Sequence, residues 1–118
     1  MLGPVLMAYQ TEEEIERLLE KSPLTATAHK SFTTKQQYKE WLGEIQRQGF
    51  VVEDETAFEG IGGVAAPIRD FSNRVIASVG IGFISSSVDS KTLKRIIKEV
   101  TDMALVISRE LGFTGQTR

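Results

Sequence analysis

The chain has 118 residues, of which 41% are hydrophobic and 25% are charged, a balance typical of one globular domain with its own core. Its 14 Lys and Arg residues are scattered and are outnumbered by 16 Asp and Glu residues, which argues against direct contact with nucleic acid. No cysteine is present, and no apolar run approaches the roughly 20 residues that span a bilayer. We expect a cytoplasmic protein without disulfides, cysteine-ligated metals or membrane contact.

Two short helices are expected near the N-terminus. Pro4 suits the first turn of a helix that carries the apolar run up to Tyr9. Thr11, with a Glu three residues later, predicts the N-cap of a second helix whose apolar residues recur along one stripe. The polar segment 21–32 contains the only histidine, His29, and is predicted to be a surface connection without a catalytic role.

A third helix is expected to begin at Thr33 or Thr34, each of which has a Gln three residues later, and to end at Gly49. Its apolar face would consist of Tyr38, Trp41, Leu42 and Ile45. A strand should then start at Phe50 and run into an acidic loop at 53–55.

Two further strands are predicted at about 61–69 and 75–84, joined by Asp, Ser and Asn residues that favour a hairpin connection. A polar break follows, and Asp89 or Ser90 is expected to cap a long C-terminal helix that ends at Gly112. The predicted fold is therefore α+β, with three helices, a three-strand antiparallel meander and a long C-terminal helix in a single domain, 1–118. At least one long edge of so small a sheet would expose unpaired backbone groups unless it is covered or paired with another chain.

The two long strands carry four glycines, although glycine weakens a strand because it has no side chain to pack. Side chains alternate across a strand, so the parity of the residues predicts one bulky face and one nearly bare face. The bulky face should hold Val75, Ala77, Val79, Ile81 and Phe83, and the bare face Gly63, Ala65, Ser78, Gly80 and Gly82. Two explanations are open: a helix packs unusually close to the bare face, or the face forms a hollow for a small molecule. In the second case Glu53 would enter from the neighbouring strand, and the loop 56–62 could act as a lid.

Motifs for catalysis are missing from the sequence. No nucleophile–base pair and no metal-ligand spacing is found, so we expect neither an enzyme nor a metal site or cofactor. The glycines at 60–63 do not match a dinucleotide-binding fingerprint, because a strand rather than a helix follows them. The run Ser85–Ser87 is interpreted as a loop before the helix cap rather than as a nucleophile.

Three stretches in this order carry a family resemblance: "GPVLMAYQTEEEIERLL", "GFVVEDETAFEGIGGVAAPIRDFSNRVIASVGIG" and "ISRELGF". Together they resemble the C-terminal effector-binding domain of IclR-family transcriptional regulators, over residues 3–113. The resemblance implies a GAF-like domain that lacks the family's first strands and its N-terminal winged helix-turn-helix. It also implies a homodimer or tetramer, and a small metabolite, often an organic or aromatic acid, that alters operator binding by the full-length protein.

The resemblance places the effector pocket on the bare face. The family's acidic position falls on Glu53, its frequent cysteine on Gly63, and two serines on Gly80 and Gly82, while small residues of its first helix fall near Gly3. Since glycine replaces three polar side chains, we expect a roomier and more apolar pocket, one that binds through backbone N–H groups, or a vestigial one. The predicted ligand-binding residues are Gly3, Glu53, Ile61, Gly63, Ala65, Ser78, Gly80 and Gly82. The alternative function is a structural dimerisation domain with a filled pocket.

Overall fold

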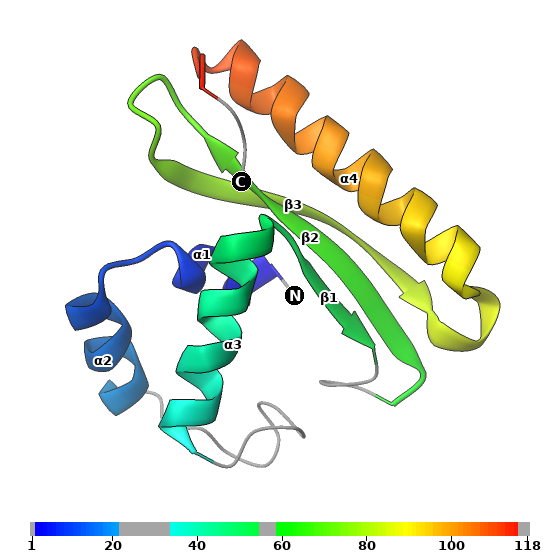
Figure 1. The fold of residues 1–118 in the computed structure, drawn as a ribbon, viewed down its shortest axis with the longest axis horizontal. Coiled ribbons are helices and arrows are strands. Elements are labelled where there is room, and N and C mark those ends of the chain that lie inside the picture. Colours follow the sequence, from blue (N-terminus) through cyan, green and yellow to red (C-terminus); the bar gives the residue numbers. More distant parts are fainter. Residues whose placement is uncertain (1, 22–33, 55–58, 116–118) are drawn as a thin grey trace.

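The computed structural model describes residues 2–21, 34–54 and 59–115 (Figure 1). They form the helices α1 (Leu2–Ala8), α2 (Glu12–Lys21), α3 (Lys35–Gln48) and α4 (Ser90–Glu110), the 3-10 turn η1 (Ser85–Ser87), and the strands β1 (Val51–Asp54), β2 (Ile61–Arg69) and β3 (Val75–Ile84). The strands pair antiparallel in the order β1–β2–β3. The predicted α+β class, the meander and the long C-terminal helix are confirmed. The predicted surface connection with His29 lies outside the described residues, apart from Lys21, which ends α2.

The helix starts follow local capping signals in the sequence. The Thr34 side chain accepts a hydrogen bond from the Gln37 N–H at 3.2 Å and so caps α3. Asp89 accepts one from the Thr92 N–H at 2.7 Å and caps α4. Each bond satisfies a donor that the first helical turn cannot pair internally. Of the alternatives left open by the sequence, Thr34 and Asp89 are therefore the caps.

Replacing Asp89 with alanine is expected to lower the free energy of unfolding, whereas asparagine should keep most of it, because an amide oxygen also caps a helix. Hydrogen bonds from Thr92 hold the pKa of the Asp89 carboxyl below its usual value of 3.8. A carboxyl group whose pKa is lower in the folded than in the unfolded state stabilises the fold above pH 3.8. This stabilisation is lost as the pH falls through the folded-state pKa. Urea unfolding at neutral pH and well below pH 3.8 measures this contribution. The Asp89→Asn variant should lose less stability on acidification than the parent, and an equal loss would contradict the assignment.

The sheet separates two hydrophobic cores, one on each face. α4 covers one face, and α1 and α3 lie over the other (Figure 1). On the α4 side the buried residues are Val64, Ala66, Ile68, Val100 and Ala104. On the other side they are Val5, Ala8, Leu19, Tyr38, Leu42, Ile45, Val51 and Ala65. β2 contributes to both cores, because its alternate side chains point to opposite faces.

A β-bulge interrupts the pairing of β2 with β3 near the hairpin. Ile68 opposes Ala77, but Arg69 opposes Val75, so Ile76 is an extra residue on β3. The bulge turns Val75 to the side of Arg69, where it lines a cleft with Tyr9. The prediction that Val75 belongs to the bulky face is therefore wrong, whereas Ala77 does pack against the α4 core as expected.

The hydroxyl of Ser108 joins the bulge to α4. Ser108 is fully buried, and its Oγ accepts a hydrogen bond from the Arg69 N–H at 2.9 Å. The same oxygen donates to the Ala104 carbonyl at 2.7 Å. One buried hydroxyl thus satisfies a strand N–H at the point where the ladder is irregular.

Within the described ranges, none of the helices combines the length and the apolar character that crossing a bilayer requires.

Candidate functional site

Seven of the eight predicted site residues lie on one face of the sheet, in neighbouring rows across the strands. Glu53, Gly63 and Gly82 are direct cross-strand neighbours and form one row. Ala65 and Gly80 stand opposite each other in the next row. Direct neighbours are about 5 Å apart and successive rows about 7 Å apart, so these five residues form a continuous patch. We call these five residues the glycine patch.

The remaining predicted residues border the glycine patch or lie apart from it. Ser78, opposite Pro67, continues the face on one side, and Ile61, opposite Ile84, continues it on the other. Ile61 is 52% exposed, so it lies at the rim of the face. Gly3 belongs to α1, and a Cβ at this position would have open space around it.

The helices cover the glycine patch unevenly. α1 packs against both β2 and β3. Ala65 is fully buried in a cluster that includes Val5 of α1 and Ile45 of α3. Gly82 is exposed and Gly80 is half-buried. The close approach of a helix therefore explains the small side chain at Ala65, whereas the face is more open at its β3 side.

Glu53 is a buried strand residue and not part of a solvated acidic loop. β1 continues to Asp54, and pairing with Gly63 turns the Glu53 side chain toward the face covered by α1 and α3. The residue is only 6% exposed. The expected acidic loop at 53–55 is thus wrong for this position, and Glu55 lies outside the described residues. A buried carboxylate makes Glu53 the strongest hydrogen-bond acceptor at the glycine patch.

Tyr38 of α3 lies near this carboxylate, which the sequence alone did not predict. Its hydroxyl donates to the Met7 Sδ of α1 at 3.8 Å. Burial, and secondarily the negative charge of Glu53, raise the pKa of Tyr38. The Trp41 ring is tilted against the Tyr38 ring at 5.7 Å between centroids. The sequence analysis assigned Tyr38 to an apolar helix face, although a buried tyrosine hydroxyl generally needs a polar partner and could have signalled this position.

These groups are suited to binding rather than to bond cleavage. The Glu53 carboxyl group, the Tyr38 hydroxyl and the exposed backbone of Gly82 provide hydrogen-bond acceptors and donors beside the small residues of the glycine patch. Among the described residues, no three Asp, Glu or His side chains come together as a metal site would require. The predicted lid at 56–62 falls partly outside the described residues.

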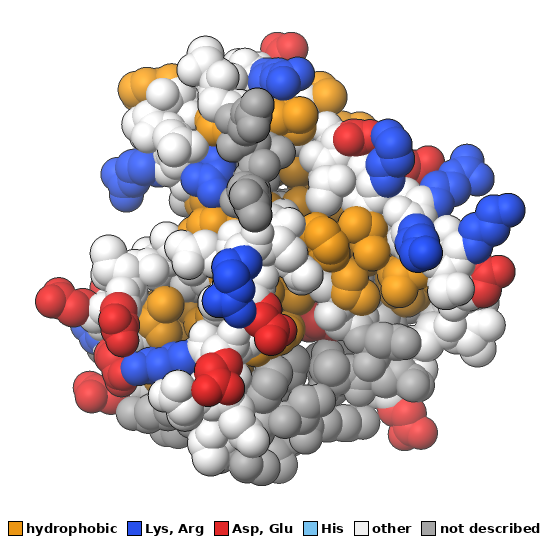
Figure 2. Space-filling view, in the orientation of Figure 1, with side chains coloured by type: hydrophobic (Ala, Val, Ile, Leu, Met, Phe, Trp, Pro, Cys, Tyr) orange, Lys and Arg blue, Asp and Glu red, His pale blue; other side chains and the backbone are white. Residues whose placement is uncertain are grey.

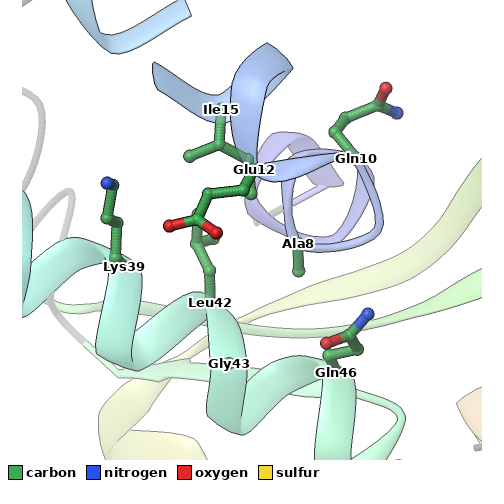
Figure 3. A pocket seen from close by; sticks show the side chains of 8 residues that line it. All are labelled: Ala8, Gln10, Glu12, Ile15, Lys39, Leu42, Gly43 and Gln46. Carbon is green, nitrogen blue, oxygen red and sulfur yellow. The ribbon is translucent and has the colours of Figure 1, made fainter.

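A hollow lies between α1, α2 and α3, away from the predicted residues. It has a volume of about 340 Å³. Figure 3 shows its lining side chains, which are Ala8, Gln10, Glu12, Ile15, Lys39, Leu42, Gly43 and Gln46. Lys39 forms an ion pair with Glu16 beside it. None of the predicted ligand-binding residues lines this hollow.

Comparison with known proteins identifies the family of this chain. Residues 1–109 match the family described as "Bacterial transcriptional regulator IclR C-terminal". The chain belongs to this family. The Escherichia coli "HTH-type transcriptional regulator XynR" is 28% identical over 112 residues, which are 95% of this chain and 44% of that regulator. The IclR-family chain thus spans less than half the length of this relative, which is named as a regulator and not as an enzyme.

Solved structures share the fold of this IclR-family chain. The C-terminal domain of the E. coli regulator KdgR superposes with a TM-score of 0.85 at 24% identity, over 95% of this chain and 68% of that one. The inducer-binding domain of PobR from Acinetobacter, a double mutant in complex with 3-hydroxybenzoic acid, superposes with a TM-score of 0.81 at 18% identity, over 95% of this chain and 64% of that one. The predicted fold, that of an IclR C-terminal domain, is therefore confirmed.

Proposed function

We propose that this chain senses a small organic or aromatic acid for a transcriptional regulator. Binding at the glycine patch would alter operator binding by the complete regulator, through a homo-oligomer in the cytoplasm, without direct contact between this chain and nucleic acid. One observation carries the proposal: Gly63, Gly80 and Gly82 leave the sheet face without side chains beside the buried Glu53, under α1 and α3. Residues 1–118 would act as one partial effector-binding domain.

The charges around the patch favour one orientation of an acid. Because like charges repel, the ligand's carboxylate would lie away from Glu53 and closer to the glycine backbone at Gly80, beside Ser78. A hydroxyl on the ligand could instead donate to the Glu53 carboxylate. The PobR domain, which shares the fold, holds an aromatic acid with one hydroxyl. We therefore favour hydroxylated acids over simple ones.

A thermal-shift screen with hydroxylated and plain organic and aromatic acids tests the proposal. A ligand at 100 times its dissociation constant should stabilise the folded chain by about 2.7 kcal/mol. The Gly82→Val variant should lose this response, because two methyl groups on the exposed glycine would occupy the open side of the patch. Valine is favoured in strands, so the variant is expected to fold.

The exposed Ser86→Val variant, in η1, is the matched control and should respond as the parent does. If no acid stabilises the parent at concentrations far above a plausible dissociation constant, sensing by this chain is contradicted. If Gly82→Val responds as strongly as the parent, the function stands but its site is elsewhere.

The alternative is a dimerisation domain whose patch is closed by its own helices. The fully buried cluster of Ala65 with Val5 and Ile45 favours this reading. A stable dimer that no acid stabilises would support it.

A further inference from the structure

A cleft with two arginines lies at the hairpin end of the sheet. It has a volume of about 430 Å³, and its walls are the turn 9–11 between α1 and α2, Gln46 of α3, and the residues Arg69, Asn73 and Arg74 at the hairpin. No residue of the glycine patch lines it. Figure 2 shows the molecule hollowed between the hairpin end of the sheet and the helices α1–α3, with Lys or Arg side chains on the hairpin side of the hollow.

The cleft and the glycine patch lie at different places on the same face of the sheet. Gly63, Ala65, Pro67 and Arg69 alternate along β2, so their side chains or Cα hydrogens point to one side. Arg69 is four residues beyond Ala65, which is about 13 Å along a strand. Ala65 is fully buried under helical side chains, which separate the two places. The buried Glu53 therefore lies at one end of this face and Arg69 at the other.

Contacts within the chain hold the Arg69 guanidinium in one place. It lies over the Tyr9 ring, 5.0 Å from the ring centroid, and its Nη1 donates to the Asn73 carbonyl at 2.9 Å. Burial raises the pKa of Tyr9, whereas the charge of Arg69 and a side-chain hydrogen bond with it act in the opposite direction. A planar guanidinium that is already oriented loses little freedom when it binds an anion.

The charge in the cleft is positive, although the chain as a whole has a net charge of −2. Its described lining includes two arginines and neither Asp nor Glu. The carboxylate of the adjacent Asp70 is engaged inside the hairpin turn, where it accepts from the Ser72 N–H at 2.8 Å and from the Ser72 hydroxyl at 2.6 Å. Glu12, at the start of α2, lines the separate hollow between the helices (Figure 3). The positive charge is thus a local property of this cleft.

We propose that this cleft is a second binding site, which takes a small oxyanion, a carboxylate or a phosphate group. Arg69 supplies the oriented pair of N–H donors, and the exposed Arg74 adds a second positive charge from the same hairpin. The side chains of Thr11 and Gln46 add neutral donors from the helical wall. A contact that only tied the hairpin to the helices would need Tyr9 and Arg69 but no second arginine. The proposal goes beyond acid sensing at the glycine patch and does not depend on it.

Titration of the chain with inorganic phosphate, and separately with malonate, tests the proposal by NMR at constant ionic strength. The amide signals of Gln10 and Asn73 should shift on binding, whereas phosphate should leave the Gly82 signal in place. Arg74→Gln should raise the dissociation constant about threefold or more, as expected for loss of an exposed charge partner. Arg69→Gln should raise it about tenfold or more, because charge-assisted hydrogen bonds are lost as well. The anion that binds more tightly identifies the preferred group.

Arg95→Gln is the matched control, because it makes the same change of charge at an 80% exposed side chain of α4, on the other face of the sheet. It should bind either anion as the parent does. Circular dichroism melting verifies that each variant is folded, and the exposed Arg74 decides the test if Arg69→Gln is not. A parent that binds neither anion at tens of millimolar would overturn the proposal, and so would equal dissociation constants for Arg74→Gln and Arg95→Gln.

The Gly82→Val variant separates this site from the proposed sensing site. It should keep phosphate binding at the cleft, because position 82 does not line the cleft. Loss of phosphate binding in this variant, with the fold intact, would place the anion at the glycine patch and overturn the second site. Phosphate binding at the cleft in a chain that no organic acid stabilises would leave the second site standing without the sensing function.

Discussion

Replacing Ile45 with alanine is expected to lower the free energy of unfolding by about 2–5 kcal/mol. Ile45 is fully buried on α3, in the same cluster as Val5 of α1 and Ala65 of β2. Alanine would remove three carbons and leave a cavity that two helices and a strand border, and such a site closes only partly. The melting temperature of a domain of this size should fall on the order of 10 °C or more, measured by calorimetry or circular dichroism.

The neighbouring Glu44, exposed on the same helix, provides the control. Glu44→Ala keeps the helical propensity and touches no core, so its melting temperature should stay close to that of the parent. Equal losses for the two variants would mean that α3 is not anchored to the sheet by this cluster. The loss at Ile45 should also weaken the proposed acid binding, since α3 holds Tyr38 near Glu53.

Replacing Ser108 with alanine is expected to cost about 1–3 kcal/mol of unfolding free energy. The substitution removes the oxygen that accepts from the Arg69 N–H at 2.9 Å and leaves that donor at the bulge without this partner. The better helix propensity of alanine offsets only a few tenths of a kcal/mol. Hydrogen exchange of the Arg69 amide should become faster than in the parent, while amides at the middle of β2 keep their protection.

Ser86→Ala is the control for Ser108, because it removes a serine hydroxyl from an exposed position in η1. Its unfolding free energy should change little. An unchanged exchange rate for the Arg69 amide in Ser108→Ala would contradict the role of this hydrogen bond.

Helix boundaries could be predicted from the sequence because their causes are local. Thr34 and Asp89 cap their helices through the residue three positions on, and Gly49 ends α3 at a φ of 84°. The strand faces followed from parity as far as the regular pairing extends, to Ile68 and Ala77. Beyond it the prediction failed, because the bulge coincides with a hydrogen bond between positions 69 and 108, 39 residues apart.

The site could be predicted only where backbone alternation decides it. Parity and the family resemblance together placed Gly63, Gly80 and Gly82 on one face, as the pairing shows. The burial of Glu53 was missed because it depends on β1 continuing through Glu53 to Asp54 and on the cover of α3, neither of which has a local signal. Tyr38 was missed for the same reason, since its neighbours come from α1 and β1.

The two cores share β2, and this sharing constrains how the chain can fold. Val64 and Ala65 are adjacent in sequence but belong to opposite cores. A slip of β2 by one residue would turn valine and isoleucine toward the helices that now meet alanine and glycine, and would turn the small residues toward α4. Overcrowding on one side and voids on the other would penalise the slipped chain twice. Strand alignment in this protein is therefore specified redundantly, and a misaligned intermediate has no core that could hold it as a kinetic trap.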